Sequence, residues 1–355
     1  NYTQTAINGV GLRPRDLYKN HFDGGLNGQT GFMDFLDIPS DIKTSDSFTP
    51  LLYVQENTTD VDQQKNGFST GVIFEAEYAP KLVSQYNESG SGTGTYPKVD
   101  VVAYMAGNSF LQADFGHVGK KVLSADMRTI AALGLAEGSN SDIVKAMFNE
   151  SGDWSSLSSK DDAQTVVRGM SGGPLIVAFK AYLQGILDGI DENTEGKKFA
   201  DVKANLTWSK FVEASHTASN GIKYVPSDTE LTNGIDATND EDGKTAVEVR
   251  EELMENYNIA YYAAGTSGAK SYYKYWIKHD PNGTDDDPMG VMEFAIVRNN
   301  VYQLGISSIR DLGDPLPFTP GKDDPDNPDK DGETYIVVQL YVRNWVVRNN
   351  SGIIL

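Results

Sequence analysis

The C-terminal stretch 334–355 constrains the fold most, because it holds the densest run of β-branched and aromatic residues in the chain. Such residues favour extended strands over helices. Alternation along the run places four apolar side chains on one face: Ile336, Val338, Leu340 and Val342. We therefore predict a long strand whose apolar face must be covered by another segment.

The apolar phase of this run changes near its end. Arg343 and Asn344 interrupt the alternation, and the apolar positions then become Trp345 and Val347. A phase change of this kind predicts a bulge or a break in the strand. Tyr335 opens the run on the opposite face.

The segment before this strand, 318–333, is rich in proline and aspartate. It carries little apolar surface to bury and few backbone donors, so it should be an extended, solvated tether. A terminal strand that joins its own sheet usually needs only a short turn before it. The long tether therefore favours a strand that reaches away from its own body.

Composition narrows the class of protein further. A chain of 355 residues is longer than a domain with a single hydrophobic core usually is, so two domains are expected. A net charge of −20 argues against nucleic acid and anionic membranes as partners. There is no cysteine, and no apolar run is long enough to span a membrane, so the mature form should not be membrane-spanning. The start at Asn1 shows no signal peptide, which fits a processed product or a fragment.

Periodicity predicts a mainly β chain with helices in its middle. The expected strands are 51–54, 70–78, 268–278, 293–297 and 301–309. Helical spacing covers 124–135, 141–148 and 174–190. A capping box at Thr245 predicts one more helix.

The sequence Gly169-Met-Ser-Gly-Gly-Pro174 resembles the segment around the nucleophile of trypsin-like proteases. Those enzymes need a base beside the serine and an acid that orients the base. Met170 replaces the acid before Ser171, and nothing around His117 matches the expected histidine segment. We interpret the motif as a glycine-rich loop before a proline-initiated helix, and keep a secreted serine hydrolase using Ser171 as a weak alternative.

Three sequence patterns could bind a ligand, and each also has a structural interpretation. The histidines do not pair at metal-ligand spacing, so no metal or cofactor is expected. The acidic tether 318–333 lacks the order of a calcium loop, which favours a solvated spacer over a calcium site. The aromatic run 272–276 could stack on carbohydrate, but a half-buried strand with aromatic cross-strand pairs explains it better.

Three separated stretches carry a resemblance to a known family. The first comprises 52–58 and a strand that ends at 75–78. The second comprises 275–276, 297–304 and 312–315. The third is the tether followed by 334–338 and 344–349. Their order and spacing resemble those of the type V fimbrillins, the pilus subunits of Bacteroidales-type Gram-negative bacteria, and especially the minor-fimbrium major subunit branch. Members normally carry a longer N-terminal segment, so the first domain here is expected to be incomplete.

The resemblance implies two transthyretin-like β-sandwich domains plus an extended C-terminal donor strand, with helices inserted in the second domain. We expect an N-terminal β domain at 1–80, a second sandwich at 81–317, the tether at 318–333 and the donor segment at 334–355. No catalytic residue is expected.

The same resemblance implies a structural subunit of an extracellular, cell-surface fimbrium that supports adhesion and biofilm formation. Its precursor would be an outer-membrane lipoprotein from which an arginine-specific protease removes the first strand, and the C-terminal strand of the next subunit would fill the resulting groove. The expected donor residues are Tyr335, Ile336, Val338, Leu340, Val342, Trp345 and Val347.

The expected partners are identical subunits, accessory tip or anchor subunits and host ligands. A tip or anchor adhesin that binds host protein or glycan is the alternative within this class. A tip subunit would lack a usable donor strand, because nothing grows beyond it, whereas this chain has one.

Overall fold

The computed structural model divides the chain into two compact units, 77–270 (the central unit) and 1–76 with 271–355 (the terminal unit). None of the helices within the described part of the chain is long and apolar enough to cross a membrane. The structure describes isolated positions between 54 and 64 and at 147–148, 196 and 290, together with 68–87, 99–114, 121–135, 158–191, 198–217, 221–233, 245–279, 292–317 and 336–344.

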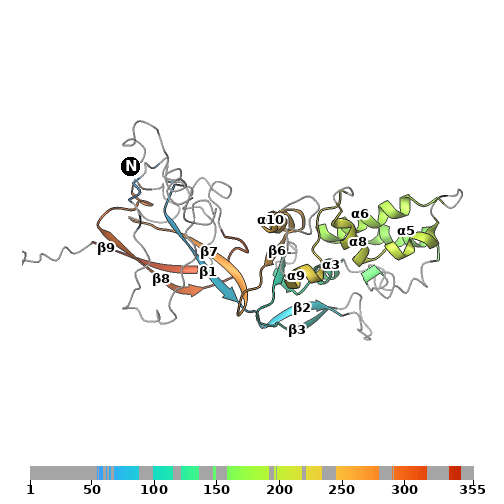
Figure 1. Ribbon diagram of the computed structural model, residues 1–355, viewed down its shortest axis with the longest axis horizontal. Coiled ribbons are helices and arrows are strands. Elements are labelled where there is room, and N and C mark those ends of the chain that lie inside the picture. The colour runs from blue at the N-terminus through green and yellow to red at the C-terminus, as the bar shows by residue number, and fades with distance from the viewer. Residues whose placement is uncertain are drawn as a thin grey trace, which may run out of the picture. The chain divides into compact units, whose positions relative to one another are not determined.

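The central unit is built on a five-stranded sheet with the strand order β3-β2-β5-β4-β6, of which Figure 1 labels β2, β3 and β6. Neighbouring strands run antiparallel except β2 and β5, which pair in parallel. The strands are β2 (Leu82–Tyr86), β3 (Val99–Ala103), β4 (Phe110–Asp114), β5 (Lys121–Ser124) and β6 (Ile259–Tyr262).

Most of the described residues between β5 and β6 lie in helices, which confirms the prediction of a mainly β chain with inserted helices. The described helices are α3 (Met127–Gly134), α5 (Lys160–Gly169), α6 (Pro174–Asp188), α7 (Phe199–Val202), α8 (Trp208–Ser215), α9 (Asp228–Asn233) and α10 (Ala246–Tyr257), with a short 3-10 turn η2 (Lys203–Asn205) after α7.

Helix α6 lies at the centre of the hydrophobic core. Pro174 occupies its first turn, where the missing N–H costs nothing. The stripe that the helical period predicts is buried at Leu175, Phe179, Leu183 and Leu187. Phe179 belongs to an aromatic cluster with ring centroids 5.2 to 5.6 Å apart, whose other members are Phe148, Trp208 and Phe211.

The capping box at Thr245 is present and starts α10. The Thr245 hydroxyl accepts a hydrogen bond from the Glu248 N–H at 3.3 Å, and the Glu248 carboxylate accepts one from the Thr245 N–H at 2.7 Å. The helix ends at Asn258, whose φ of 58° puts it in the left-handed region. This sharp end turns the chain directly into β6.

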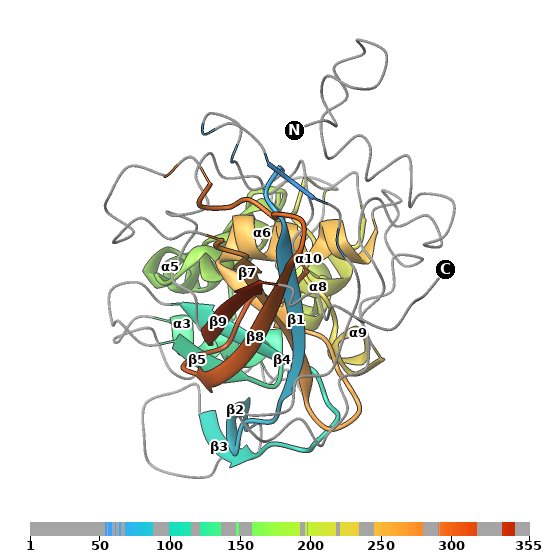
Figure 2. The same ribbon diagram turned by 90° about the vertical axis from the view of Figure 1, so that its left-hand side faces the viewer.

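The described part of the terminal unit contains two two-stranded sheets, and Figure 2 shows their four strands. The first pairs β1 (Gly71–Tyr78) with β7 (Ala269–Trp276), and the second pairs β8 (Asn300–Ile309) with β9 (Ile336–Asn344). Gly71 is required in β1, because a Cβ there would lie 2.6 Å from the Trp276 ring. This division places 271–317 with the two chain ends, whereas the sequence-based division placed it with 81–270.

The predicted strand at 293–297 is wrong. Glu293 and Phe294 lie in a turn, and Ile296 forms an isolated bridge with Asn57. The Glu293 carboxylate accepts a hydrogen bond from the Gly290 N–H at 2.8 Å, while the Glu293 N–H donates to the Gly290 carbonyl at 3.3 Å. These two bonds close the turn and outweigh the β propensity of a short apolar run.

Strands β1, β7 and β8 confirm the predicted strands at 70–78, 268–278 and 301–309, and α3 and α6 confirm two of the predicted helices. Most of the predicted strand at 51–54 and most of the predicted helix at 141–148 lie outside the described residues.

Candidate functional site

The pair formed by β8 and β9, which we call the C-terminal ribbon, carries the predicted assembly residues. The two strands run antiparallel from Asn300 opposite Asn344 to Ile309 opposite Ile336. A bulge between Ile306 and Ser308 interrupts the register. The Ser307 hydroxyl there donates a hydrogen bond to the Val337 carbonyl at 2.9 Å. The pairing is therefore continuous along both strands, with one fixed irregularity.

One face of the ribbon is apolar beyond its first pair, Asn300 with Asn344, apart from the Tyr302 hydroxyl. Directly opposed residues of an antiparallel pair share a face. The apolar face consists of four such pairs: Tyr302 with Val342, Leu304 with Leu340, Ile306 with Val338, and Ile309 with Ile336. Ile336 is buried, but 45% of Ile306 and 52% of Ile309 are exposed. Part of an apolar face thus stays in contact with solvent in the isolated chain.

The opposite face of the ribbon is mixed in character. Its opposed pairs are Val301 with Arg343, Gln303 with Tyr341, Gly305 with Gln339, and Ser308 with Val337. Gln339 and Tyr341 are exposed. The ribbon therefore has one side suited to burial and one suited to solvent.

Within the described strands, β8 and β9 have no neighbour other than each other. A two-stranded ribbon is marginally stable in water unless a further strand or a helix covers it. Its outer edges also present backbone N–H and C=O groups that can pair with another strand. The described part of the ribbon should therefore be marginally stable alone and able to pair with another strand, since each of its strands pairs on one side and apolar side chains stay exposed.

Side chains hold β8 in place at its start. The Tyr302 hydroxyl accepts a hydrogen bond from the Val297 N–H at 2.8 Å and lies 2.9 Å from His279 Nδ1. Burial raises the pKa of Tyr302 above its ordinary value, although the Val297 N–H opposes this rise. The turn before the strand includes Asn299, with a φ of 60°.

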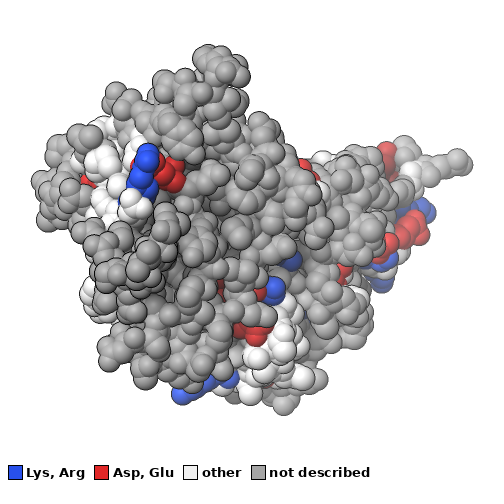
Figure 3. Space-filling model, turned by 60° about the vertical axis from the view of Figure 1, so that its left-hand side comes forward, with Lys and Arg blue, Asp and Glu red and all other residues white. Residues whose placement is uncertain are grey.

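The same turn carries an ion pair with the N-terminal part of the unit. The guanidinium of Arg298 lies 2.8 Å from the Glu56 carboxylate, and its hydrogen bond holds the pKa of Glu56 below the ordinary value. On the molecular face in Figure 3, the described basic and acidic side chains lie close to one another, with no large patch of one sign among them.

Strand β9 lacks comparable anchors. Among the side chains described at 336–342, none hydrogen-bonds to a residue outside β9. What holds β9 is its backbone pairing with β8 and the burial of its apolar face, especially at Ile336. Release of β9 would therefore break its backbone ladder and the bond from Ser307 to the Val337 carbonyl, but no hydrogen bond from a described β9 side chain to another element.

The structure brings four of the seven predicted donor residues to one face of β9: Ile336, Val338, Leu340 and Val342. Tyr335, Trp345 and Val347 lie outside the described residues, and so does any break beyond Asn344. In this single chain β9 pairs with β8 of the same chain. Sequence reasoning missed the four β8 residues that complete the face, although the alternation in 301–309 could have identified them.

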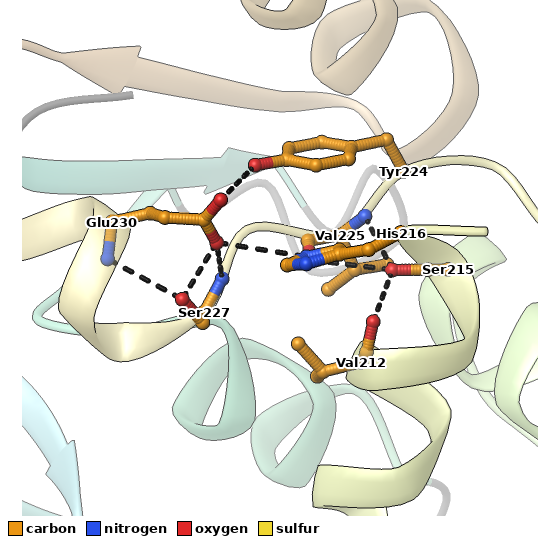
Figure 4. A network of polar contacts seen from close by, with 7 residues as sticks. All are labelled: Val212, Ser215, His216, Tyr224, Val225, Ser227 and Glu230. Carbon is orange, nitrogen blue, oxygen red and sulfur yellow. Dashed lines mark hydrogen bonds and ion pairs between the residues drawn. The ribbon is translucent and has the colours of Figure 1, made fainter. Parts of the chain in front are cut away.

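A polar network in the central unit is the other candidate (Figure 4). The Glu230 carboxylate accepts hydrogen bonds from the Tyr224 hydroxyl at 2.6 Å, the Ser227 hydroxyl at 2.6 Å and the Ser227 N–H at 2.7 Å. His216 Nε2 lies 3.5 Å from the same carboxylate. Burial raises the pKa of Glu230, but the hydrogen bonds from Ser227 and Tyr224 outweigh burial and hold the pKa below its ordinary value.

This network contains a serine, a histidine and a carboxylate, but it is not arranged for nucleophilic catalysis. The Ser215 hydroxyl donates to the Val212 carbonyl at 2.7 Å, and accepts from the Val225 N–H at 3.0 Å. His216 Nε2 faces the Val225 carbonyl at 2.9 Å. A catalytic base must reach the nucleophile's proton, whereas here each polar group is used to fix the segment after α8 to the start of α9.

The hydrolase alternative finds no support at Ser171 either. Ser171 is exposed in the loop between α5 and α6, as the glycine-rich-loop interpretation predicts. In the described part of the chain no hydrogen bond joins Ser171 to a histidine, and His117 lies outside that part.

The metal alternative is likewise without support in the residues available. No group of three or more acidic or histidine side chains that could hold a metal ion occurs among the described residues. The acidic tether, which was the calcium alternative, lies outside them.

Comparison with known proteins adds one finding. Residues 262–351 match the family described as "Major fimbrial subunit protein type IV, Fimbrillin, C-terminal". The match spans about a quarter of the 355 residues and includes the whole C-terminal ribbon. Neither the curated proteins nor the solved structures give a match.

The match confirms the expected resemblance to fimbrillins in this part of the chain. It supports a fimbrial structural subunit, a class of proteins that assemble into filaments at the cell surface and are not enzymes.

Proposed function

We propose that this chain is a structural subunit of a bacterial surface fimbria, and that it polymerises head to tail by giving its C-terminal strand β9 to the adjacent subunit. The observation that carries the proposal is the C-terminal ribbon, which lies inside the fimbrillin match and has an apolar face that is partly exposed. Adhesion and biofilm formation would follow from the filament. Accessory tip or anchor subunits and host ligands are its further expected partners.

Exchange of β9 between subunits would preserve the contacts that β9 makes with β8. The β8 of a neighbour offers the same backbone groups and the same opposed side chains as the chain's own β8. The exchanged strand would therefore keep the pairing that it makes in the isolated chain. The acidic, proline-rich tether 318–333 gives the strand reach, at about 3 Å per residue when extended.

Exchange would also bury apolar side chains that are exposed in the isolated chain. An unpaired strand edge in the neighbouring subunit would cover the backbone groups and the apolar face that the ribbon leaves exposed. Fully burying an aliphatic side chain contributes about 1.5–3 kcal/mol, as an upper bound. The contact uses different surfaces on the two subunits and does not close on itself, so it generates a fibre.

We also propose that the chain belongs to the type V, minor-fimbrium branch of Bacteroidales fimbrillins and matures from an outer-membrane lipoprotein. The three stretches of resemblance support this finer assignment. Removal of an N-terminal strand by an arginine-specific protease would supply the groove that receives β9. N-terminal sequencing of filaments sheared from the producing cells tests it, with an N-terminus that follows an arginine in the precursor as the expected result.

Two aspartate substitutions in neighbouring positions of β9 test the exchange mechanism. Leu340 lies on the apolar face, and Gln339 is exposed on the other face. Leu340→Asp should abolish filaments in electron micrographs, because a buried unpaired carboxylate is costly. Gln339→Asp is the matched control and should leave filaments intact.

Circular dichroism of both variants should stay close to that of the unmodified monomer, because the described helices lie in the central unit. Filaments formed by Leu340→Asp as readily as by the unmodified chain would contradict the mechanism. If both variants lose filaments equally, filament formation requires that β9 carry no added negative charge on either face, and the test would not show that one face is buried.

A further inference from the structure

Strand β8 is held at both of its ends by contacts that do not involve β9. Its start follows a buried turn around Phe294, which is bonded to Gln64. Its end leads to Gly313, which is bonded to Ser271 of β7. Strand β8 therefore has reasons to keep its position that do not depend on its pairing with β9.

Gln64 fixes the turn that precedes β8. Its side chain is fully buried. Its Oε1 accepts a hydrogen bond from the Phe294 N–H at 2.8 Å, and its Nε2 donates one to the Gly290 carbonyl at 3.1 Å. Both polar ends of one amide are thus bonded to the same turn. Because a buried backbone group without a partner is costly, loss of this amide should loosen the turn.

Asn57 fixes the same turn from a second position. Its N–H donates to the Ile296 carbonyl at 2.9 Å, and its carbonyl accepts from the Ile296 N–H at 2.7 Å. The Asn57 side chain donates to the Phe68 carbonyl at 2.6 Å, close to the start of β1. Ile296 is itself buried, and β8 begins shortly after it, at Asn300. The start of β8 is therefore joined to the N-terminal part of the terminal unit.

Ser271 fixes the segment that follows β8. It is fully buried, and its hydroxyl accepts a hydrogen bond from the Gly313 N–H at 2.8 Å. Beside it, the Asp314 N–H donates to the Tyr272 carbonyl at 2.7 Å, and the Tyr272 N–H donates to the Asp314 carbonyl at 2.9 Å. Gly313 is required, because a Cβ there would overlap the Tyr272 carbonyl. These contacts join the end of β8 to β7.

Two fixed ends make β8 a pre-organised strand. Between them lie the half-exposed side chains of Ile306 and Ile309, so burial alone does not hold the later part of β8. A strand whose ends are already fixed loses less conformational freedom when a partner pairs with it. After β9 leaves, β8 should therefore present its backbone groups and its apolar face in the geometry that a second β9 requires.

We propose that Gln64 and Ser271 are positioning residues for strand exchange, which hold β8 in place while its own β9 is replaced by the β9 of another copy. This role rests on the proposed exchange of β9. It gives the two strands of the ribbon different tasks, since β8 stays and β9 moves. It also gives a task to the segment before β1, where Gln64 lies.

Hydrogen exchange of the full chain, measured by mass spectrometry, tests the two anchors before any assembly takes place. The amides of Phe294 and Gly313 donate to Gln64 and Ser271. They should exchange more slowly than the amides of β9, because they stay bonded when the ribbon opens. Exchange at these two positions that is as fast as in β9 overturns the proposal, since β8 would then leave together with β9.

Gln64→Met removes one anchor and keeps its packing. Methionine is unbranched and apolar, so it can fill the buried space, but it has no donor and its sulfur is a weak acceptor. Exchange in the turn around Phe294 should become at least about tenfold faster. The control is Gln184→Met on α6, where the glutamine amide donates to Asp188 of the same helix. Unchanged exchange around Phe294 in Gln64→Met overturns the proposal.

Peptide binding tests the role in exchange. The probe is a fluorescent synthetic peptide of residues 334–355, and the receptor is the full chain with Leu340→Asp, whose own β9 should compete poorly for β8. Addition of Gln64→Met or Ser271→Ala should weaken peptide binding, measured by anisotropy, at least about tenfold, because β8 is no longer pre-organised. Addition of Gln184→Met should leave binding unchanged. A change that merely loosened β9 would raise peptide binding instead.

The possible failures can be told apart. If the Leu340→Asp chain binds no peptide, exchange of β9 is wrong, and the positioning role is overturned with it. Peptide binding that is equal with and without Gln64→Met overturns the positioning role alone and leaves the exchange mechanism intact.

Discussion

The central sheet and the C-terminal ribbon differ in how completely each buries its strands. In the central unit, β4 pairs on both sides, and Phe110, Leu111 and Ala113 are almost fully buried. In the ribbon, β9 pairs with β8 alone among the described strands, and its apolar face includes half-exposed partners on β8. The same chain thus contains a strand that is fixed by its surroundings and a strand that is not.

This difference has an energetic consequence. Releasing β4 would break two ladders and expose a packed core, which amounts to unfolding the unit. Releasing β9 would break one ladder and expose side chains that are partly solvated already. Local opening of the ribbon should therefore be far more frequent than opening of the central sheet. Each prediction below compares the two regions, beginning with the largest effect.

Phe179→Ala should separate the two regions most clearly. Phe179 is fully buried in the aromatic cluster of the central unit, so truncation should lower the free energy of unfolding of that unit by about 3–5 kcal/mol. The amides of β9 should keep their hydrogen-exchange rates, measured by mass spectrometry. Val177→Ala, at an exposed position of the same helix, is the control and should cost little. Faster exchange in β9 would show that the regions are coupled.

Glu230→Gln should destabilise the central unit by about 1–3 kcal/mol, because it leaves buried donors with a weaker acceptor. The pKa of Glu230 is lowered in the folded state from an ordinary value of 4.5. Its stabilising contribution is therefore complete above about pH 4.5 and is lost as the pH falls through the folded pKa.

Chemical denaturation of the native chain and of Glu230→Gln should converge as the pH is lowered through this range. The exposed Glu213→Gln, on α8, provides the matched control and should keep the native pH profile. A difference between native chain and variant that is constant with pH would contradict the assignment.

Thr245→Ala removes the hydroxyl of the α10 capping box and should lower the stability of the central unit by about 1 kcal/mol. Thr245→Ser retains the hydroxyl and should recover most of the loss. Thermal unfolding followed at a helix-sensitive wavelength measures both. If alanine and serine behave alike, the cap contributes nothing to the unit.

Arg298→Gln tests the anchor at the start of the ribbon and should have the smallest effect. Arg298 is largely exposed, so the ion pair with Glu56 should contribute only about 0.5 kcal/mol to the stability of the terminal unit. The effect should shrink in high salt. A loss larger than that of Thr245→Ala, measured by denaturant unfolding, would mean that this turn controls the ribbon.

The sequence was most informative where the pattern was long and regular. The stripe of α6, the capping box at Thr245 and the alternation in 336–342 each specify one geometry, and the structure has it. Strands β2 to β6 were missed because each has only four or five residues, too few to show a period.

The candidate site was foreseen only in part. The common face of Ile336, Val338, Leu340 and Val342 was predicted, but their pairing with β8 was not, because a sequence pattern gives the face of a strand and not its partner. Helix α5 was missed, although Ser159 caps it and Asp161 and Asp162 lie in its first turn. Its apolar stripe is short, so the N-terminal signals were the only strong ones.

The four apolar pairs of the ribbon favour one register. Sliding β9 along β8 by two residues would preserve which side chains face inward, but either Tyr302 or Ile309 would lose its apolar partner. Any copy of β9 that pairs with this β8 should therefore prefer the same register. A fibre built from such joints would have one repeat distance along its whole length.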